Sequence, residues 1–171
     1  MITLTVPNEM YLPSYLEAYD AYMALGGGSY GMTDARAVDI FEKYHNYRNA
    51  INLKPDRVGS DYYWLVDTDK AYFIGEIAIR HRLNEALSLR GGHIGYVIRT
   101  EAWNQGYGTQ MLCLALEKAR ERGLEKVLCT CNDDNIGSAR VMEKNGFVLQ
   151  DKVLVDGTLC RRYWKVLETS P

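Results

Sequence analysis

The chain has 171 residues, of which 47% are hydrophobic and 25% charged, which is enough to bury the core of one domain over residues 1–171. Its formal net charge of −2 gives no electrostatic footprint for a nucleic acid or an anionic membrane, so we expect neither partner. No apolar run approaches the roughly 20 residues of a spanning helix, and the N-terminal segment lacks the basic-then-apolar pattern of a signal peptide. We therefore expect a cytoplasmic protein.

The first half of the sequence predicts a strand, two helices and a pair of strands. In chain order these are a strand at Ile2–Val6, a helix capped by Asn8 over Glu9–Leu25 and ended by Gly26, Gly27 and Gly28, a second helix from a cap at Thr33 or Asp34 to about Asn52, and strands at Asp61–Val66 and Ala71–Arg80.

The last of these strands carries an unusual carboxylate. Regular alternation places Glu76 on one face with Tyr72, Ile74 and Ala78, where it would interrupt an apolar surface. Because an unpaired carboxylate is costly to bury, Glu76 is either exposed, paired with an arginine or functional. In the functional case it is a general base, since partial burial raises the pKa of a carboxyl group toward neutrality.

The second half predicts a strand, helix, strand unit followed by a helix and a hairpin, after an insertion at residues 81–92 that contains a short helical turn. The elements are a central strand at His93–Arg99, a helix from Gly106 to about Arg122 with Gly123 as its cap, a strand at Lys126–Cys131, a helix from near Asn135 to Asn145 capped by Asp133 or Asp134, and strands at Phe147–Val155 and Thr158–Leu167 joined by Asp156-Gly157. The first unit favours parallel pairing with a right-handed crossover.

His93 begins the central strand, and shares a face there with Gly95 and Val97. A lone histidine is usually a hydrogen-bonded structural residue. Its ordinary pKa of about 6.5 nevertheless makes His93 a second candidate base.

The four cysteines give no metal or disulfide pattern. Cys129 and Cys131 share one strand face, a spacing that fits neither a zinc site nor a C-x-x-C redox pair. A disulfide framework is not expected in a chain of this length without a secretion signal. We interpret these two cysteines as small buried apolar side chains and expect no metal.

The segment Tyr96–Gln110 runs from an apolar strand through a polar turn into a helix opened by Gly106 and Gly108. The first N–H groups of a helix have no intrahelical acceptor, and glycines let an anion approach them, so this pattern predicts a phosphate cradle. Met111 replaces the third glycine of a dinucleotide loop, and the Gly-Lys-Ser/Thr of a nucleotide P-loop is absent. The spacing alone also fits a tight turn without a ligand.

A second motif follows about thirty residues later, Asn135-Ile-Gly-Ser-Ala-Arg-Val-Met-Glu-Lys-Asn-Gly-Phe147. Together the two motifs resemble the GNAT superfamily of acyl-CoA-dependent N-acyltransferases. Its signature is Q/R-x-x-G-x-G/A at a helix start, then an Asn, a small residue and a closing Gly-Phe. The resemblance covers roughly residues 63–165. It implies an α/β GNAT-like fold with a central mixed, mostly antiparallel sheet, a parallel splayed pair and flanking helices.

The resemblance further implies acetyl-CoA as cosubstrate. Pyrophosphate would rest on the loop amides, and pantetheine would pair with the central strand and with the second motif. The residues implied are Tyr96, Val97, Ile98, Asn104, Gln105, Gly106, Tyr107, Gly108, Thr109, Asn135 and Ser138. The sequence departs from the family at Trp103, where Gln or Arg is usual. It departs again at Met142, where many members place the tyrosine that protonates the CoA thiolate.

An amine attacks a thioester only when it is uncharged, so the site must accept a proton. We predict acetyl transfer to a primary amine by direct attack, with Glu76 as the leading base and His93 as the second. The departure at Met142 keeps open a non-catalytic module that binds acyl-CoA as a sensor or structural subunit. The acceptor is predicted to be a small-molecule or peptide amine whose identity the sequence does not give, and a homodimer is compatible with the sequence.

Overall fold

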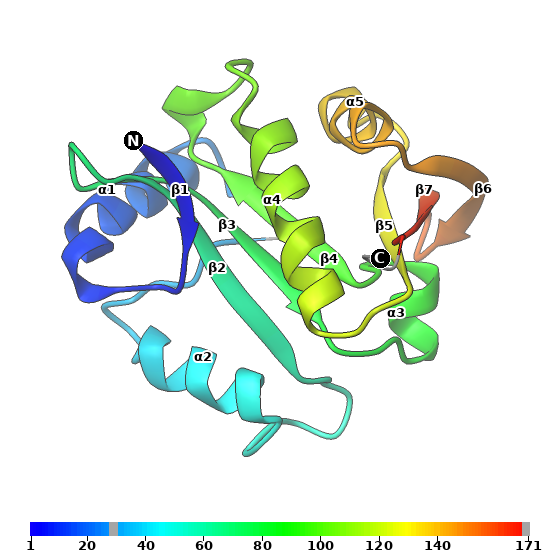
Figure 1. Cartoon of the computed structure of the whole chain (residues 1–171), viewed down its shortest axis with the longest axis horizontal. Helices are drawn as coiled ribbons and strands as arrows, with labels where there is room; N and C mark the ends of the chain where they lie inside the picture. Colours follow the sequence, from blue (N-terminus) through cyan, green and yellow to red (C-terminus); the bar gives the residue numbers. More distant parts are fainter. Residues whose placement is uncertain (28–30, 169–171) are drawn as a thin grey trace.

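The computed structural model describes residues 1–27 and 31–168. These residues form a seven-stranded sheet with helices packed on it (Figure 1). Its strands are β1 (Ile2–Thr5), β2 (Ser60–Asp67), β3 (Tyr72–Arg80), β4 (Ile94–Ile98), β5 (Lys126–Asn132), β6 (Val148–Val155) and β7 (Thr158–Val166). The order across the sheet is β1-β2-β3-β4-β5-β7-β6, and only β4 and β5 pair in parallel. The predicted mixed sheet with one parallel pair is confirmed.

Helices cover both faces of this sheet. They are α1 (Leu12–Ala24), α2 (Ile40–Asn49), α3 (Glu85–Leu89), α4 (Tyr107–Glu121) and α5 (Ile136–Lys144), with 3-10 turns η1 (Glu9–Tyr11) and η2 (Thr100–Ala102). An aromatic cluster joins α1 and α2 to one face, and an aliphatic cluster joins α4 and α5 to the other. Cys129 and Cys131 are unpaired and buried in the aliphatic cluster, as interpreted from the sequence.

The closing hairpin forms at the predicted turn. Asp156 and Gly157 have φ angles of 49° and 76°, as a two-residue type I′ turn requires. Asn8 caps the first helical turn by accepting from Met10 N at 2.9 Å. The predicted end of α1 includes Gly28, which lies outside the described residues.

The predicted caps of two helices are wrong, although α5 begins near Asn135 as predicted. The side chain of Asp39, not of Thr33 or Asp34, accepts hydrogen bonds from the first turn of α2. Asp34 instead organises a preceding turn, because its carbonyl accepts from Val38 N. In α5, the cap is Asn135 itself rather than Asp133 or Asp134.

A bulge in β3 changes which way Glu76 points. Leu65 lies opposite Gly75, whereas Val66 lies opposite Phe73, so Ile74 is an extra residue that reverses the alternation of faces. Ile74 packs in the aliphatic cluster beneath α4, while Glu76 contacts α2 on the other face. The predicted shared face of Glu76 with Tyr72 and Ile74 is therefore wrong.

The parallel pair is splayed. Within the described residues, β4 and β5 share the single register pair Ile94–Cys129, whereas β5 pairs with β7 over seven residues. The two parallel strands thus stop pairing toward their carboxyl ends. This opening lies beside the N-terminus of α4, which follows β4 in the chain (Figure 1).

Candidate active site

The loop between β4 and α4 leaves the start of the helix open. Gly106 is the N-cap residue, with φ 85°, and no side chain caps the helix there. A Cβ atom added to Gly106 would meet nothing within 4 Å. The first N–H groups of the helix, from Tyr107 to Thr109, therefore have no side-chain cap and no intrahelical acceptor, and they lie at the positive end of the helix dipole.

Gly108 serves a different purpose. A Cβ atom added there would lie 3.2 Å from Cγ2 of Val141 on α5. The absent side chain thus lets α4 and α5 approach each other closely. A larger residue at this position would disturb helix packing as well as any bound anion.

The side chains of the loop hold the loop itself. Trp103, which stands in the place of the family's Gln or Arg, donates from Nε1 to the carbonyl oxygen of Ile98 at 2.8 Å. Gln105 donates from Nε2 to the carbonyl oxygen of Glu101 at 2.9 Å. Asn104 supports the bend with a left-handed φ of 59°. An anion at this loop would consequently be bound by backbone N–H groups.

The backbone of β4 presents alternate residues to the opening. Arg99 N donates to Ile74 O on β3 at 2.8 Å, so regular alternation turns the backbone groups of Val97 toward β3 as well. The backbone groups of Tyr96 and Ile98 then point toward β5, where the strands no longer pair. Because the carbonyl oxygen of Ile98 already accepts from Trp103 Nε1, an extended chain with amide groups would pair here with Tyr96 and with the N–H group of Ile98.

The second motif borders the same opening. Asn135 caps α5 by accepting at Oδ1 from Ser138 N at 3.1 Å, which leaves its Nδ2 group as the donor for a ligand. The hydroxyls of Ser138 and Tyr96 lie 2.8 Å apart, so the tyrosine side chain bridges β4 and α5. Burial raises the pKa of Tyr96 and keeps the phenol protonated.

This hydroxyl pair is a feature that the sequence did not predict, since Tyr96 was assigned only a backbone contact. Met142, where a tyrosine is usual, is fully buried in the core and supplies no acid. The pair of Tyr96 and Ser138 provides proton-bearing groups near that position.

Glu76 is buried on the opposite face of the sheet, and its exposed fraction is 7%. Its Oε2 atom accepts from Tyr44 Oη at 2.5 Å and from Trp64 Nε1 at 2.9 Å. Burial raises the pKa of Glu76, while the two hydrogen bonds and the nearby Lys43 act in the other direction. This buried carboxyl group therefore has a pKa displaced toward neutrality and a fixed orientation.

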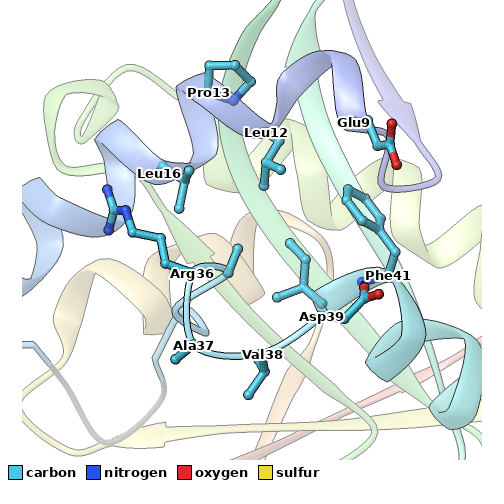
Figure 2. A pocket seen from close by; sticks show the side chains of 11 residues that line it. Glu9, Leu12, Pro13, Leu16, Arg36, Ala37, Val38, Asp39 and Phe41 are labelled. Carbon is cyan, nitrogen blue, oxygen red and sulfur yellow. The ribbon is translucent and has the colours of Figure 1, made fainter.

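A polar cleft of about 580 Å³ leads to Glu76. Its walls come from α2 and from residues 52–57, and its floor includes Tyr62 and Glu76. A second groove, of about 760 Å³, lies beside the loop at residues 35–39 that precedes α2. Leu12 and Leu16 of α1 and Phe41 of α2 make this second groove largely apolar (Figure 2). Glu76 thus borders the polar cleft while its side chain stays largely buried.

His93 is placed away from this cleft. It follows Gly92 directly before β4, and its Nδ1 atom accepts from Leu128 N on β5 at 3.0 Å. Burial, together with Arg80 and Lys126, lowers the pKa of His93 to about 4. The ring is consequently neutral and occupied in joining β4 to β5, and His93 does not line the cleft that contains Glu76.

The comparisons with known proteins agree with this geometry. The model of the acetyltransferase (GNAT) domain matches residues 12–148, and the chain belongs to this family. Among the described residues 1–27 and 31–168, no His, Cys, Asp and Glu cluster is arranged to hold a metal, and none of the helices found there is long and apolar enough to cross a bilayer.

Solved structures resemble the whole chain. The ribosomal L7/L12 alpha-N-protein acetyltransferase in complex with coenzyme A is 15% identical, with a TM-score of 0.72 over 99% of this chain and 96% of that one. The ribosomal-protein-S5-alanine acetyltransferase from Vibrio fischeri is 14% identical, with a TM-score of 0.66 over 99% and 96%. The protein yncA from Salmonella typhimurium, solved with its cofactor acetyl-CoA, is 13% identical, with a TM-score of 0.66 over 99% and 95%. Acetyl-CoA is the cosubstrate of the family, and two of these structures contain coenzyme A or acetyl-CoA.

Proposed function

We propose that this acetyltransferase moves an acetyl group from acetyl-CoA to a primary amine by direct attack, with Glu76 as general base. The observation that carries the proposal is a buried, oriented carboxylate with a raised pKa at the floor of a cleft, on the strand next to β4. Such a group accepts a proton near neutral pH, which an incoming ammonium must lose before it attacks.

The cosubstrate fits the opposite side of the sheet. The free N–H groups of Tyr107, Gly108 and Thr109 receive the pyrophosphate, and the space around Gly106 leaves room for it. Tyr96 offers its backbone groups, and Ile98 its N–H group, to the pantetheine amides in the splayed opening, since the Ile98 carbonyl oxygen accepts from Trp103. Asn135 adds a donor from Nδ2, next to Ser138. Bound acetyl-CoA supplies the activated thioester.

The reaction then needs three proton transfers. Glu76 takes the first proton from the ammonium, and the neutral nitrogen forms a bond to the acetyl carbon. As the carbon–sulfur bond breaks, the departing thiolate needs a proton, and we assign its delivery to the hydroxyl pair of Tyr96 and Ser138. The second proton that the nitrogen loses then restores the hydroxyl pair. A backbone N–H of β4 polarises the carbonyl during the attack.

His93 is not part of this scheme. Its Nδ1 lone pair is used by Leu128 N, and its lowered pKa makes it a weak base. We propose that His93 instead fixes the start of β4 against β5. The backbone groups of Val97 face β3, so Val97 offers none of them to the pantetheine arm. Its side chain packs on the aromatic cluster and helps to hold β4 in place.

The test is acetyl transfer to a panel of primary amines, followed as thiol release, with acetyl-CoA affinity measured in parallel by calorimetry. The proposal expects turnover with at least one amine class. A protein that binds acetyl-CoA tightly and acetylates no amine in the panel would instead be the acyl-CoA-binding sensor or structural module that the sequence left open.

A further inference from the structure

The cleft at Glu76 is lined by one more cationic side chain than carboxylates. The cations are Lys43 from α2, Lys54 and Arg57 from the loop that follows, and Arg80 from β3, which donates to the carbonyl oxygens of Gly91 and Gly92. The carboxylates are Asp39, Glu42 and Glu76. Asp39 caps α2 by accepting from Phe41 N and Glu42 N, and Glu76 accepts from Tyr44 and Trp64. Among the described residues, Glu42 forms no ion pair within 4.0 Å with Lys43 or Arg57.

Lys43 is the clearest case. Its Nζ atom hydrogen bonds to the hydroxyl of Thr33 at 2.5 Å and lies 5.6 Å from the centre of the Tyr62 ring. Within residues 1–27 and 31–168, no carboxylate oxygen comes within 4.0 Å of Nζ. Burial lowers the pKa of Lys43, the charge of Glu76 raises it in part, and the charge of Arg57 lowers it further. An anion between Lys43 and Arg57 would offset the repulsion between these two cations.

The position of these cations relative to Glu76 defines a two-part site. Lys43 precedes Tyr44, whose hydroxyl binds Glu76, and it interacts electrostatically with that carboxylate. The side chain of Arg57 is 58% exposed, and within residues 1–27 and 31–168 its ion pair is with the adjacent Asp56, at 3.7 Å, so its guanidinium can turn to a ligand. The proton acceptor and the cations thus line a single cleft.

We propose that the acceptor is a small amine that also carries an anionic group, either a carboxylate or a phosphate, which Lys43 and Arg57 bind while Glu76 takes the proton from the amine. This inference rests on the proposed function and narrows its substrate class. Lys54, at the edge of the cleft, adds long-range attraction for the same anion.

The test uses two matched pairs of amines that differ by one anionic group: 4-aminobutyrate with butylamine, and phosphoethanolamine with ethanolamine. We expect kcat/KM to favour the anionic member of at least one pair by about tenfold or more, because a hydrogen bond to a charged group is worth about one factor of ten or above. The pair that shows the preference identifies carboxylate or phosphate as the recognised group.

The double variant Lys43→Gln with Arg57→Gln should bring that ratio close to one, mainly through KM for the anionic amine. Using the ratio cancels any effect of Lys43 on the basicity of Glu76, because that effect applies to both members of a pair. Lys70→Gln, in the turn at the far end of the β2–β3 hairpin, is the matched control and should keep the parental ratio. A ratio near one in both pairs for the parent, or an unchanged ratio in the double variant, overturns the inference.

Calorimetry separates this inference from the proposed function. The four amines are titrated into the parent and the double variant, each saturated with coenzyme A. Binding of an anionic amine that the double variant loses supports the inference even if no amine is acetylated. Transfer to all four amines with equal kcat/KM leaves the proposed function intact and removes the inference.

Discussion

Glu76 on β3 lies directly opposite Val97 on β4, so the buried carboxylate stands one strand away from the backbone that borders the splayed opening. The same strand pair has Tyr44 and Trp64 on one face and α4 on the other. In the proposed function, the acceptor and the cosubstrate would therefore approach from the two faces of the sheet and meet at β4.

Gly108 provides a test of the packing described for α4 and α5. Gly108→Val should lower the free energy of unfolding by about 1–3 kcal/mol, because the added branches meet Val141. Gly108→Ala is the graded control and should cost less. Chemical denaturation measures both, and a Gly108→Val midpoint equal to that of the parent would contradict the packing role.

Asn135 combines a cap and a ligand donor, and two variants separate them. Asn135→Ala should lose about 1 kcal/mol of stability with the cap, and should also weaken binding of coenzyme A severalfold, as loss of one neutral hydrogen bond does. Asn135→Ser keeps a capping oxygen, so it should retain stability and still show the weaker binding. If the serine variant bound coenzyme A like the parent, Nδ2 would have no role in binding.

If the hydroxyls of Tyr96 and Ser138 act together, the effects of removing each of them on kcat should not be additive. Tyr96→Phe and Ser138→Ala should each lower kcat by about 10²-fold, the lower end of acid–base assistance, while leaving the dissociation constant of acetyl-CoA within a factor of about three. Because the two hydroxyls act as one unit, the double variant should be no slower than the worse single variant. Multiplication of the two single effects would show that the hydroxyls act separately.

The lowered pKa of His93 should make the folded protein less stable in acid. Its pKa is about 4 in the folded protein and about 6.5 when unfolded, so between these values the unfolded chain binds more protons. The contribution of His93 to stability is therefore complete above pH 6.5 and is lost as the pH falls toward 4. The difference in unfolding free energy between the parent and His93→Gln should shrink across that window. A difference independent of pH would show that His93 titrates normally.

The structural features that depend on residues close together in the chain could be predicted from the sequence. The loop at Gly106, the helix that follows, the hairpin turn at Asp156-Gly157 and the buried Cys129 follow from local spacing, and the structure confirms them. The two motifs were also sufficient to identify the family. The catalytic and cofactor-binding roles of individual residues stay predictions.

Features that depend on distant contacts were missed. The face of Glu76 is set by a bulge that only the register with β2 reveals. The contact between Tyr96 and Ser138 joins residues 42 positions apart. Gly108 was interpreted from its motif, but its neighbour Val141 comes from another helix. Several polar residues before α2 could cap it, and only the tertiary position of the helix selects Asp39.

The central claim is that Glu76 is the base, and turnover by Glu76→Gln tests it most directly. The amide is nearly isosteric and can still accept from Tyr44 and Trp64, so the fold and the affinity for acetyl-CoA should be retained. Transfer to the best amine acceptor should fall by at least about 10²-fold, and the acidic limb of the pH–rate profile should disappear. A folded Glu76→Gln protein with parental turnover and an unshifted acidic limb would contradict the account.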